Sequence, residues 1–465
     1  MRKDLFIILI AGLVWGLGWA PAAHAQTAAA GIVESALATE GRGVRLGERV
    51  LLHFGGDATV GYDSNLQYAP EGVPGAPPRR QGAYVALRPF VDFATRNTAR
   101  DGATPHKLDF RFHLGTDVRF IITGDRTFDR SHIGVGVDAA GLVTLFPASP
   151  YTFELFDNFA RSSVLPYQQV DQPQNINFDT NDLGLRFRWR PGRGVGGKLG
   201  RLETIFAYRF GLYAFEPDRV SALFADKNYT SHDFQLRSQW RFFPRTAVYV
   251  NVEETVYQYF KRDAATPPNS YPLRLTAGLT GLLLPKLQLH LGAGYGNGFY
   301  RPEGVTCKPL PTDPMQRAAC ASPNTWLLQA DLTWTPREWI PFTVGYRHDF
   351  SVSLVGSYYD LQSAGFTVRP RIWRVFTNLR FTWEHRTFNG NLRVDNFAPG
   401  RVDDLFIIHF DASYAIRRWL VASIGDEGQI NVSNCQFLTL NDVTNPAFSC
   451  RYRRNDLFIK LSVSY

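Results

Sequence analysis

The last nine residues of the chain alternate apolar and polar side chains without a break. Leu457, Ile459, Leu461, Val463 and Tyr465 recur at every second position, and polar residues fill most of the positions between them. A period of two residues is that of a β-strand, because successive side chains of a strand point to opposite faces. The chain is therefore expected to end on a strand with one apolar face and one largely polar face.

The same alternation recurs from about residue 49 onward. In residues 107–121, apolar side chains from Leu108 to Phe120 alternate with ionic side chains such as Asp109 and Arg111. Charged side chains at this density need partners in a dry core, whereas a water-filled lumen accepts them. The pattern predicts an all-β fold, a transmembrane antiparallel up-and-down β-barrel of about 18 strands, or 16. Its least regular strands are residues 151–161, where the alternation slips near Phe156, residues 357–368 and the strand after Trp419.

The connections between these strands alternate between long and short. Short turns fall at 146–150, 243–246, 284–286, 369–371 and 417–419, and long connections fall at 63–82, 162–180, 216–229, 261–271, 300–323, 389–401 and 428–452. Outer-membrane barrels have long extracellular loops and short periplasmic turns. We expect the same here, with both termini on the periplasmic side, and two exceptions at 97–106 and 352–356. A secreted β-sandwich or β-solenoid competes, but it would need outward charges and loops of similar length at both ends.

The N-terminus has the pattern of an export signal. Residues 1–25 combine a basic start, a short apolar stretch and an Ala-x-Ala site at Ala23 and Ala25, which predicts a cleaved signal peptide rather than an uncleaved membrane anchor. Residues 26–48 are expected to form a short periplasmic segment, too short for a plug domain, and residues 49–465 the barrel. An aromatic content of 14% suits strands with aromatic girdles, and the expected location is the bacterial outer membrane.

The net charge of +8 raises the question of nucleic-acid binding. The arginines are scattered singly or in pairs along strands, and no basic tail or helix is present in the sequence. A phosphate-backbone binder is expected to cluster its cations. The sequence therefore predicts no nucleic-acid partner.

Four cysteines fall in two of the long connections. Local pairing of Cys307 with Cys320 and of Cys435 with Cys450 is the favoured connectivity, because an exported chain meets an oxidising compartment. Each disulfide would close a short loop and contribute about 3 kcal/mol in the entropic model. Metal binding is the alternative, but neither loop contains a histidine and neither pair has C-x-x-C spacing. We predict no metal and no cofactor.

Arginines on the polar faces of the strands are the candidate functional residues. A positive lumen would concentrate anions, and guanidinium groups pair well with carboxylates and phosphates. Cross-strand ion pairs that stiffen the wall are the alternative role. The predicted pore-lining set, which includes fewer acids than arginines, is Arg111, Arg119, Arg186, Arg188, Arg190, Arg209, Arg237, Arg241, Arg347, Arg374, Arg380, Arg386, Asp109, Asp117 and Glu384.

No arrangement of residues predicts an enzyme. His348 and Asp349 are adjacent and so point to opposite faces of a strand, which prevents them from acting as a coupled dyad. His113, His290 and His409 are isolated in the sequence and are expected to be structural. Phosphate-binding loops, metal motifs and nucleophile elbows are not found in the sequence.

Three stretches carry a resemblance to known barrels. The C-terminal strand resembles the closing strand of outer-membrane barrels, which implies that the barrel assembly machinery reads Leu461, Val463 and Tyr465. Residues 60–65, Val-Gly-Tyr-Asp-Ser-Asn, and residues 343–353, which begin Thr-Val-Gly-Tyr-Arg-His-Asp-Phe, resemble the β-barrel porin-2 group. Many members of that group accompany exopolysaccharide systems, and the plan is similar to that of polysaccharide porins in myxobacteria and of alginate-type export barrels.

This resemblance implies an outer-membrane conduit for an extracellular polysaccharide. Separate periplasmic or inner-membrane export proteins would then deliver the polymer, and outer-membrane lipid would surround the barrel. A diffusion porin for small anionic or sugar solutes is the second hypothesis. A closed barrel that acts as a scaffold or adhesin is the third, although about 18 strands enclose water unless loops fill the lumen.

Overall fold

The computed structural model describes most of the chain after residue 42. The signal peptide predicted for residues 1–25 and most of the segment predicted for 26–48 lie outside the described residues. The described residues are 43–47, 50–66, 79–95, 107–126, 129, 133–162, 177–192, 200–216, 228–261, 269–300, 322–353, 358–389, 401–434, 436–437, 448–449 and 451–465.

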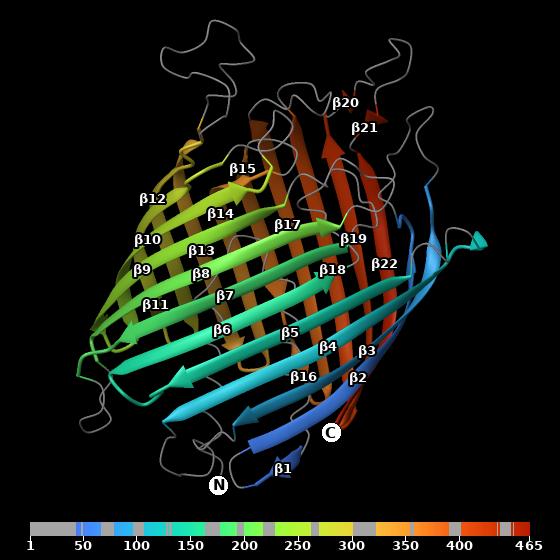
Figure 1. Cartoon of the computed structure of the whole chain (residues 1–465), viewed down its shortest axis with the longest axis horizontal. Coiled ribbons are helices and arrows are strands. Elements are labelled where there is room, and N and C mark those ends of the chain that lie inside the picture. Colours follow the sequence, from blue (N-terminus) through green and yellow to red (C-terminus); the bar gives the residue numbers. More distant parts are fainter. Residues whose placement is uncertain are drawn as a thin grey trace, which may run out of the picture.

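Eighteen antiparallel strands form a closed barrel, as the alternating sequence predicted (Figure 1). Each strand pairs with its neighbours in sequence, and β22 pairs with β2 to close the ring. The strands are β2 (Val50–Asp63), β3 (Gly82–Thr95), β4 (Leu108–Ile122), β5 (Gly134–Leu145), β6 (Tyr151–Ser162), β7 (Asn177–Trp189), β8 (Leu202–Glu216), β9 (Tyr229–Phe243), β10 (Thr246–Tyr259), β11 (Leu273–Leu284), β12 (Leu287–Asn297), β13 (Asn324–Arg337), β14 (Ile340–Val352), β15 (Tyr358–Val368), β17 (Val375–Asn389), β18 (Val402–Arg417), β19 (Leu420–Ser433) and β22 (Tyr452–Ser464).

Four short strands lie outside the ring. β1 (Val44–Leu46) pairs with the first residues of β2, and β16 (Arg371–Ile372) pairs with the start of β17. β20 (Gln436–Phe437) and β21 (Phe448–Ser449) form a two-residue ladder of their own. β1 and β16 lie at one rim of the barrel, and β20 and β21 lie at the opposite rim (Figure 1).

The connections differ between the two rims. Two-residue turns join β9 to β10, β11 to β12, β13 to β14 and β18 to β19, and Tyr465 lies at the same rim as these turns (Figure 1). We call this rim the turn end and the opposite rim, where most of the long connections lie, the loop end. The predicted alternation of long and short connections is therefore present. Beyond the exception expected at 97–106, the connection from β7 to β8 is also long at the turn end.

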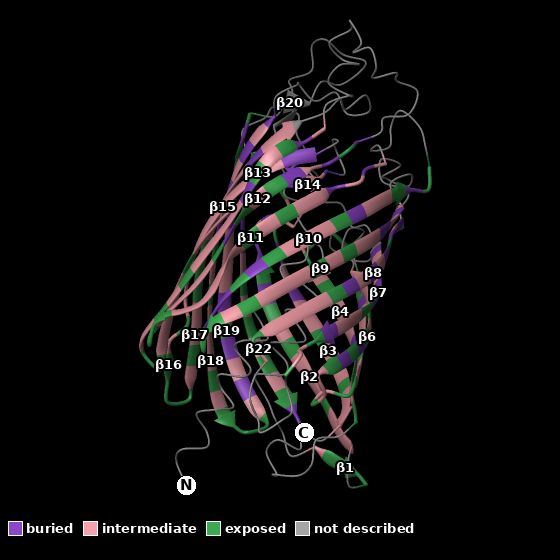
Figure 2. Ribbon diagram, turned by 90° about the vertical axis from the view of Figure 1, so that its left-hand side faces the viewer, coloured by how far each residue is buried: buried purple, intermediate pink, exposed green. Residues whose placement is uncertain are grey.

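The outer face of the barrel is a continuous apolar surface. Val60, Leu114 and Ile459, for example, are 59%, 54% and 61% exposed, and exposed residues alternate with less exposed ones along the strands (Figure 2). A soluble protein rarely exposes so large an apolar surface, whereas a closed barrel can place it in lipid with every ladder hydrogen bond satisfied. The barrel therefore spans a membrane. Among the described residues, no helix is long and apolar enough to cross a membrane.

Three local features differ from the simplest sequence interpretation. The slip near Phe156 leaves the pairing of β6 unbroken, because Phe156 faces inward over Gly184 and Asp157 faces outward. β7 begins at Asn177 and β19 continues to Ser433, inside segments that the sequence assigned to loops. Polar residues near the loop end, such as Asn431, weaken the apolar alternation there and hide these strand ends.

Candidate channel lumen

The cross-strand register identifies the side chains of the inner wall. Residues paired across two strands share a face, and the exposed apolar residues mark the outer face. Most of the predicted pore-lining residues lie on the opposite, inner face. These are Asp109, Arg111, Asp117, Arg119, Arg186, Arg188, Arg209, Arg237, Arg241, Arg347, Arg380, Glu384 and Arg386.

Two predicted residues lie outside the strands. Arg374 falls in the turn between β16 and β17, and Arg190 follows the last residue of β7. Arg190 donates to Thr152 Oγ1 at 3.0 Å. The sequence placed both arginines on strands because the alternation continues for a residue or two past the point where the chain turns.

Carboxylates are as prominent on the inner wall as arginines, contrary to the expectation of an arginine-rich surface. They come from nearly every part of the ring and include residues that the predicted set omitted. The inward acids among the described residues are Asp57, Asp63, Asp92, Asp109, Asp117, Asp138, Glu154, Asp182, Glu203, Asp233, Glu253, Asp331, Asp349, Glu384, Asp403, Asp411, Glu427 and Asp456.

Arginines and acids form a ladder across β6, β7, β8 and β9. Arg186 Nη1 donates to Glu154 Oε2 at 2.7 Å, and Arg188 lies 3.5 Å from the same carboxylate and 3.6 Å from Glu203. Arg241 continues the ladder to Glu203 at 3.3 Å. The predicted arginines on this side of the barrel are therefore held by neighbouring strands rather than projecting singly into the lumen.

A second network lies closer to the loop end and joins β7, β8, β9 and β10. Arg209 donates to Asp233 at 2.7 Å and lies 3.6 Å from Asp182. Tyr213 donates to Asp182 at 3.0 Å, and Thr255 donates to Asp233 at 2.6 Å. Arg209 is only 8% exposed, so this guanidinium is part of the wall structure.

The first resemblance motif, residues 60–65, closes the barrel. Asp63 accepts hydrogen bonds from Arg454 at 2.7 and 2.9 Å across the β2–β22 seam. Asn65 reaches the same strand, because its side-chain amide donates to the backbone carbonyl of Arg453 at 2.9 Å. Tyr84 packs over Gly61, where any Cβ would lie 2.4 Å from its ring.

Arg119 extends this seam network into β4. Its guanidinium lies 3.8 Å from the centre of the Tyr84 ring and 3.9 Å from Asp63, and Tyr84 donates to Asp456 at 2.7 Å. The seam network thus ties β3 and β4 to β2 and β22. The sequence singled out Arg119 but missed its partners Tyr84 and Asp63, because they lie on other strands of the barrel.

The second resemblance motif, in β14, also has contacts on both faces. Asp349 faces inward, accepts from Arg274 at 3.0 Å and pairs with Arg347. His348 faces outward, where its ring stacks on Trp326 at 3.9 Å and its Nδ1 lies 2.7 Å from the Trp326 carbonyl oxygen. Opposite faces for His348 and Asp349 are what their adjacent positions in a strand predicted.

Arg386 and Glu384 are also paired, on the inner face of β17. Next to them Arg401 pairs with Asp403, which accepts from Ser433. This network joins the loop ends of β17, β18 and β19.

Arg111, Arg237 and Arg380 are the inward arginines that have no carboxylate within 4.0 Å among the described residues. Arg111 and Arg380 are exposed to the lumen. Arg237 is half-buried and lies 4.4 Å from the centre of the Tyr249 ring. These three residues are the ones best placed to meet a solute.

Two of the histidines that appeared isolated in the sequence are held between acids. His113 Nδ1 lies 2.6 Å from Asp92 and its Nε2 lies 2.7 Å from Asp138, so a protonated ring donates to both. His409 lies 3.0 Å from Asp411 and 3.4 Å from Glu427. A structural role agrees with these contacts. No local sequence pattern indicated these contacts, because they cross strands.

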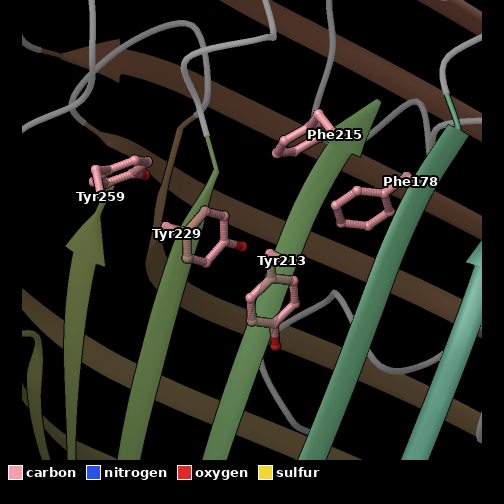
Figure 3. Packing of buried hydrophobic residues seen from close by; sticks show 5 residues of the cluster. All are labelled: Phe178, Tyr213, Phe215, Tyr229 and Tyr259. Carbon is pink, nitrogen blue, oxygen red and sulfur yellow. The ribbon is translucent and has the colours of Figure 1, made fainter. Parts of the chain in front are cut away.

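Aromatic side chains fill the inner face near the loop end of β7–β10. The cluster consists of Phe178, Tyr213, Phe215, Tyr229 and Tyr259, which come from four neighbouring strands (Figure 3). Tyr213 and Tyr229 stack at 4.5 Å, and Phe178 and Phe215 at 4.6 Å. Because each ring is almost fully buried, this part of the wall is packed rather than open to a passing solute.

The C-terminal strand is integrated at the turn end. Leu461, Val463 and Tyr465 face outward, and Tyr465 exchanges backbone hydrogen bonds with Phe54 at 2.9 and 3.3 Å. Their reading by the assembly machinery stays a prediction. Cys307, Cys320, Cys435 and Cys450 lie outside the described residues, so their pairing also stays a prediction.

Comparison with known proteins gives distant likenesses only. No family model matches the chain, and no curated protein matches it. Three Pseudomonas aeruginosa structures are similar. OpdQ shares 10% identity over 89% of this chain and 98% of its own, with a TM-score of 0.43. OccK2 (OpdF), in complex with glucuronate, shares 10% identity over 91% of this chain and 99% of its own, with a TM-score of 0.43. The siderophore receptor PirA shares 9% identity over 91% of this chain and 81% of its own, with a TM-score of 0.40. Likenesses this weak carry no argument about this chain.

Proposed function

We propose that this chain is a bacterial outer-membrane channel that passes an extracellular polysaccharide outward. The observation that carries the proposal is a closed barrel with an apolar exterior and an inner wall of paired ions. A barrel of about 18 strands is wide enough to enclose water unless loops fill it.

The pairing of charges favours a sugar over a small anion. Arg186, Arg188, Arg209 and Arg241 each lie within 4.0 Å of a carboxylate, so their charge is largely compensated. A compensated wall does not concentrate anions as a bare arginine surface would. It still offers many donors and acceptors to hydroxyl groups, which suits a hydroxyl-rich polymer. The resemblance of two sequence stretches to the β-barrel porin-2 group supports the same cargo.

We also propose an orientation for the barrel in the membrane and a set of partners. The turn end would face the periplasm and the loop end the exterior, as in other outer-membrane barrels. The chain would be exported with a cleaved signal peptide and folded by the barrel assembly machinery. Periplasmic or inner-membrane export proteins would deliver the polymer to the turn end.

A clean in-frame deletion tests the cargo. We expect loss of surface polysaccharide, measured by dye binding and by sugar composition of the surface fraction, with unchanged entry of small solutes. Complementation with the wild-type gene should restore the polymer. Unchanged surface polymer would overturn the secretion role.

Single-channel recording tests the channel itself. Purified protein in a planar bilayer should give stable conductance with weak ion selectivity, because the wall charges are paired. Conductance with strong anion selectivity would favour a diffusion porin for anionic solutes. Absence of conductance would favour a closed scaffold or adhesin.

A further inference from the structure

Exposed arginines and tryptophans gather on three consecutive connections at the turn end. Each has an arginine followed two residues later by a tryptophan. These are Arg337 and Trp339 between β13 and β14, Arg371 and Trp373 between β15 and β17, and Arg417 and Trp419 between β18 and β19. We call residues 337–339, 371–374 and 417–419 the Arg-Trp rim.

The tryptophans of this rim are unusually open. Trp373 is 75% exposed, Trp419 50% and Trp339 40%. Trp373 has a φ of 54°, a left-handed conformation that a bulky residue rarely adopts. Its ring lies 6.3 Å from that of Tyr414, a residue of the lipid-facing surface. The fold therefore holds this indole at the edge of the apolar surface, where the membrane ends.

The arginines of the rim are not neutralised by acids. Arg371, Arg374, Arg417 and Arg418 are exposed and have no carboxylate within 4.0 Å among the described residues. Glu338 is the one acidic residue in the three segments. Arg374 instead lies 4.9 Å from the Trp373 ring, and Arg371 lies 4.8 Å from the Phe376 ring. Arginine charge is thus largely compensated by acids inside the lumen but is uncompensated at the Arg-Trp rim.

We propose that the Arg-Trp rim binds the phosphate headgroups of anionic phospholipids in the adjoining leaflet. Tryptophan prefers the level of the headgroups, because its ring is apolar and its N–H is polar. Guanidinium groups bind phosphate through two parallel hydrogen bonds. Both residue types recur in each of three turns at the edge of the apolar surface, where such a headgroup lies. This inference concerns the surrounding lipid and is independent of the cargo.

The test compares lipid retention by the full-length protein and two charge variants. Wild-type protein in detergent is mixed with phosphatidylglycerol or phosphatidylcholine, and bound lipid is measured by native mass spectrometry. Wild type should retain phosphatidylglycerol preferentially, and the variant R371Q/R374Q/R418Q should retain about tenfold less, with added salt lowering the wild-type value toward that of the variant.

The matched control removes the same amount of positive charge from other connections at the turn end. The variant R201Q/R245Q/K286Q changes exposed cations that lie outside the Arg-Trp rim. It should retain phosphatidylglycerol within about twofold of wild type. Heat-modifiable mobility on gels verifies that both variants fold. Equal retention of the two lipids by wild type, or an equal loss in the two variants, would overturn the proposal.

Discussion

At the residue scale, the features that looked most like a family signature serve to fasten the barrel. Asp63 and Arg454 are both buried, and their hydrogen bond joins the first strand of the ring to the last. Breaking a buried pair leaves an uncompensated charge, whereas an exposed pair contributes little. The first role of residues 60–65 is therefore to join β2 to β22 at the seam.

Asp63→Asn should destabilise the barrel by about 2 kcal/mol, because the buried Arg454 guanidinium loses its closer carboxylate and keeps only Asp456, at 3.2 Å. Denaturant unfolding in detergent, followed by tryptophan fluorescence, measures the change in the free energy of unfolding. The matched control is Asp125→Asn. It breaks an ion pair with Arg80 at 3.1 Å in which both side chains are substantially exposed, and it should cost well under about 1 kcal/mol. Equal losses in the two variants would contradict the role assigned to the seam.

Gly61→Ala should destabilise the barrel by about 1–3 kcal/mol, because the new methyl group meets the Tyr84 ring. The same substitution in a Tyr84→Ala background should cost much less, because the obstacle is gone. Unfolding of the four proteins in this double-mutant cycle gives the coupling. Gly365→Ala is the control, since the nearest atom to its Cβ lies at 3.4 Å. Additive losses would show that packing against Tyr84 is not the cause.

At the element scale, the period-two pattern predicted the strands and their up-and-down order well, but not the register in which neighbouring strands pair. Residues 107–121 and the C-terminal strand were recognised because one face is apolar and the other ionic, and they are β4 and β22. The contacts of His113, by contrast, depend on the register of β3, β4 and β5 relative to each other. No local pattern contains that register. The ion networks were therefore beyond sequence analysis, even though the residues in them were recognised.

The short β20–β21 ladder bears on the second predicted disulfide. Gln436 pairs with Ser449. In the sequence, Gln436 directly follows Cys435 and Ser449 directly precedes Cys450. An antiparallel ladder brings paired residues within the Cα distance that a disulfide spans. We expect peptide mapping under non-reducing conditions to recover Cys435 linked to Cys450 and Cys307 linked to Cys320. Cross-linked peptides between the two loops, or free thiols, would contradict the local pairing.

At the scale of the whole molecule, the excess positive charge has a different location from the one the sequence suggested. The arginines on the polar faces of the strands led to an expectation of an arginine-rich lumen. Composition does not show whether an arginine has a partner, and cross-strand acids compensate much of the inner wall. Arg371, Arg374, Arg417 and Arg418 instead lie exposed on turns. The lumen and the turn end therefore have different electrostatic roles.

This division predicts which substitutions change ion selectivity. Arg111 and Arg380 are exposed on the inner wall without a carboxylate partner among the described residues, so reversing their charge leaves the ion ladders intact. The double variant R111E/R380E should shift the ratio of cation to anion permeability by about twofold or more toward cations, because fixed charge in a narrow aqueous path attracts counter-ions. The reversal potential in a KCl gradient measures this ratio. R245E/R371E makes the same charge change on the turns, where bulk water and salt screen it, and should shift the potential far less. If the turn variant shifts the potential as much as the lumen variant, the conducting path does not run along the inner wall of the barrel.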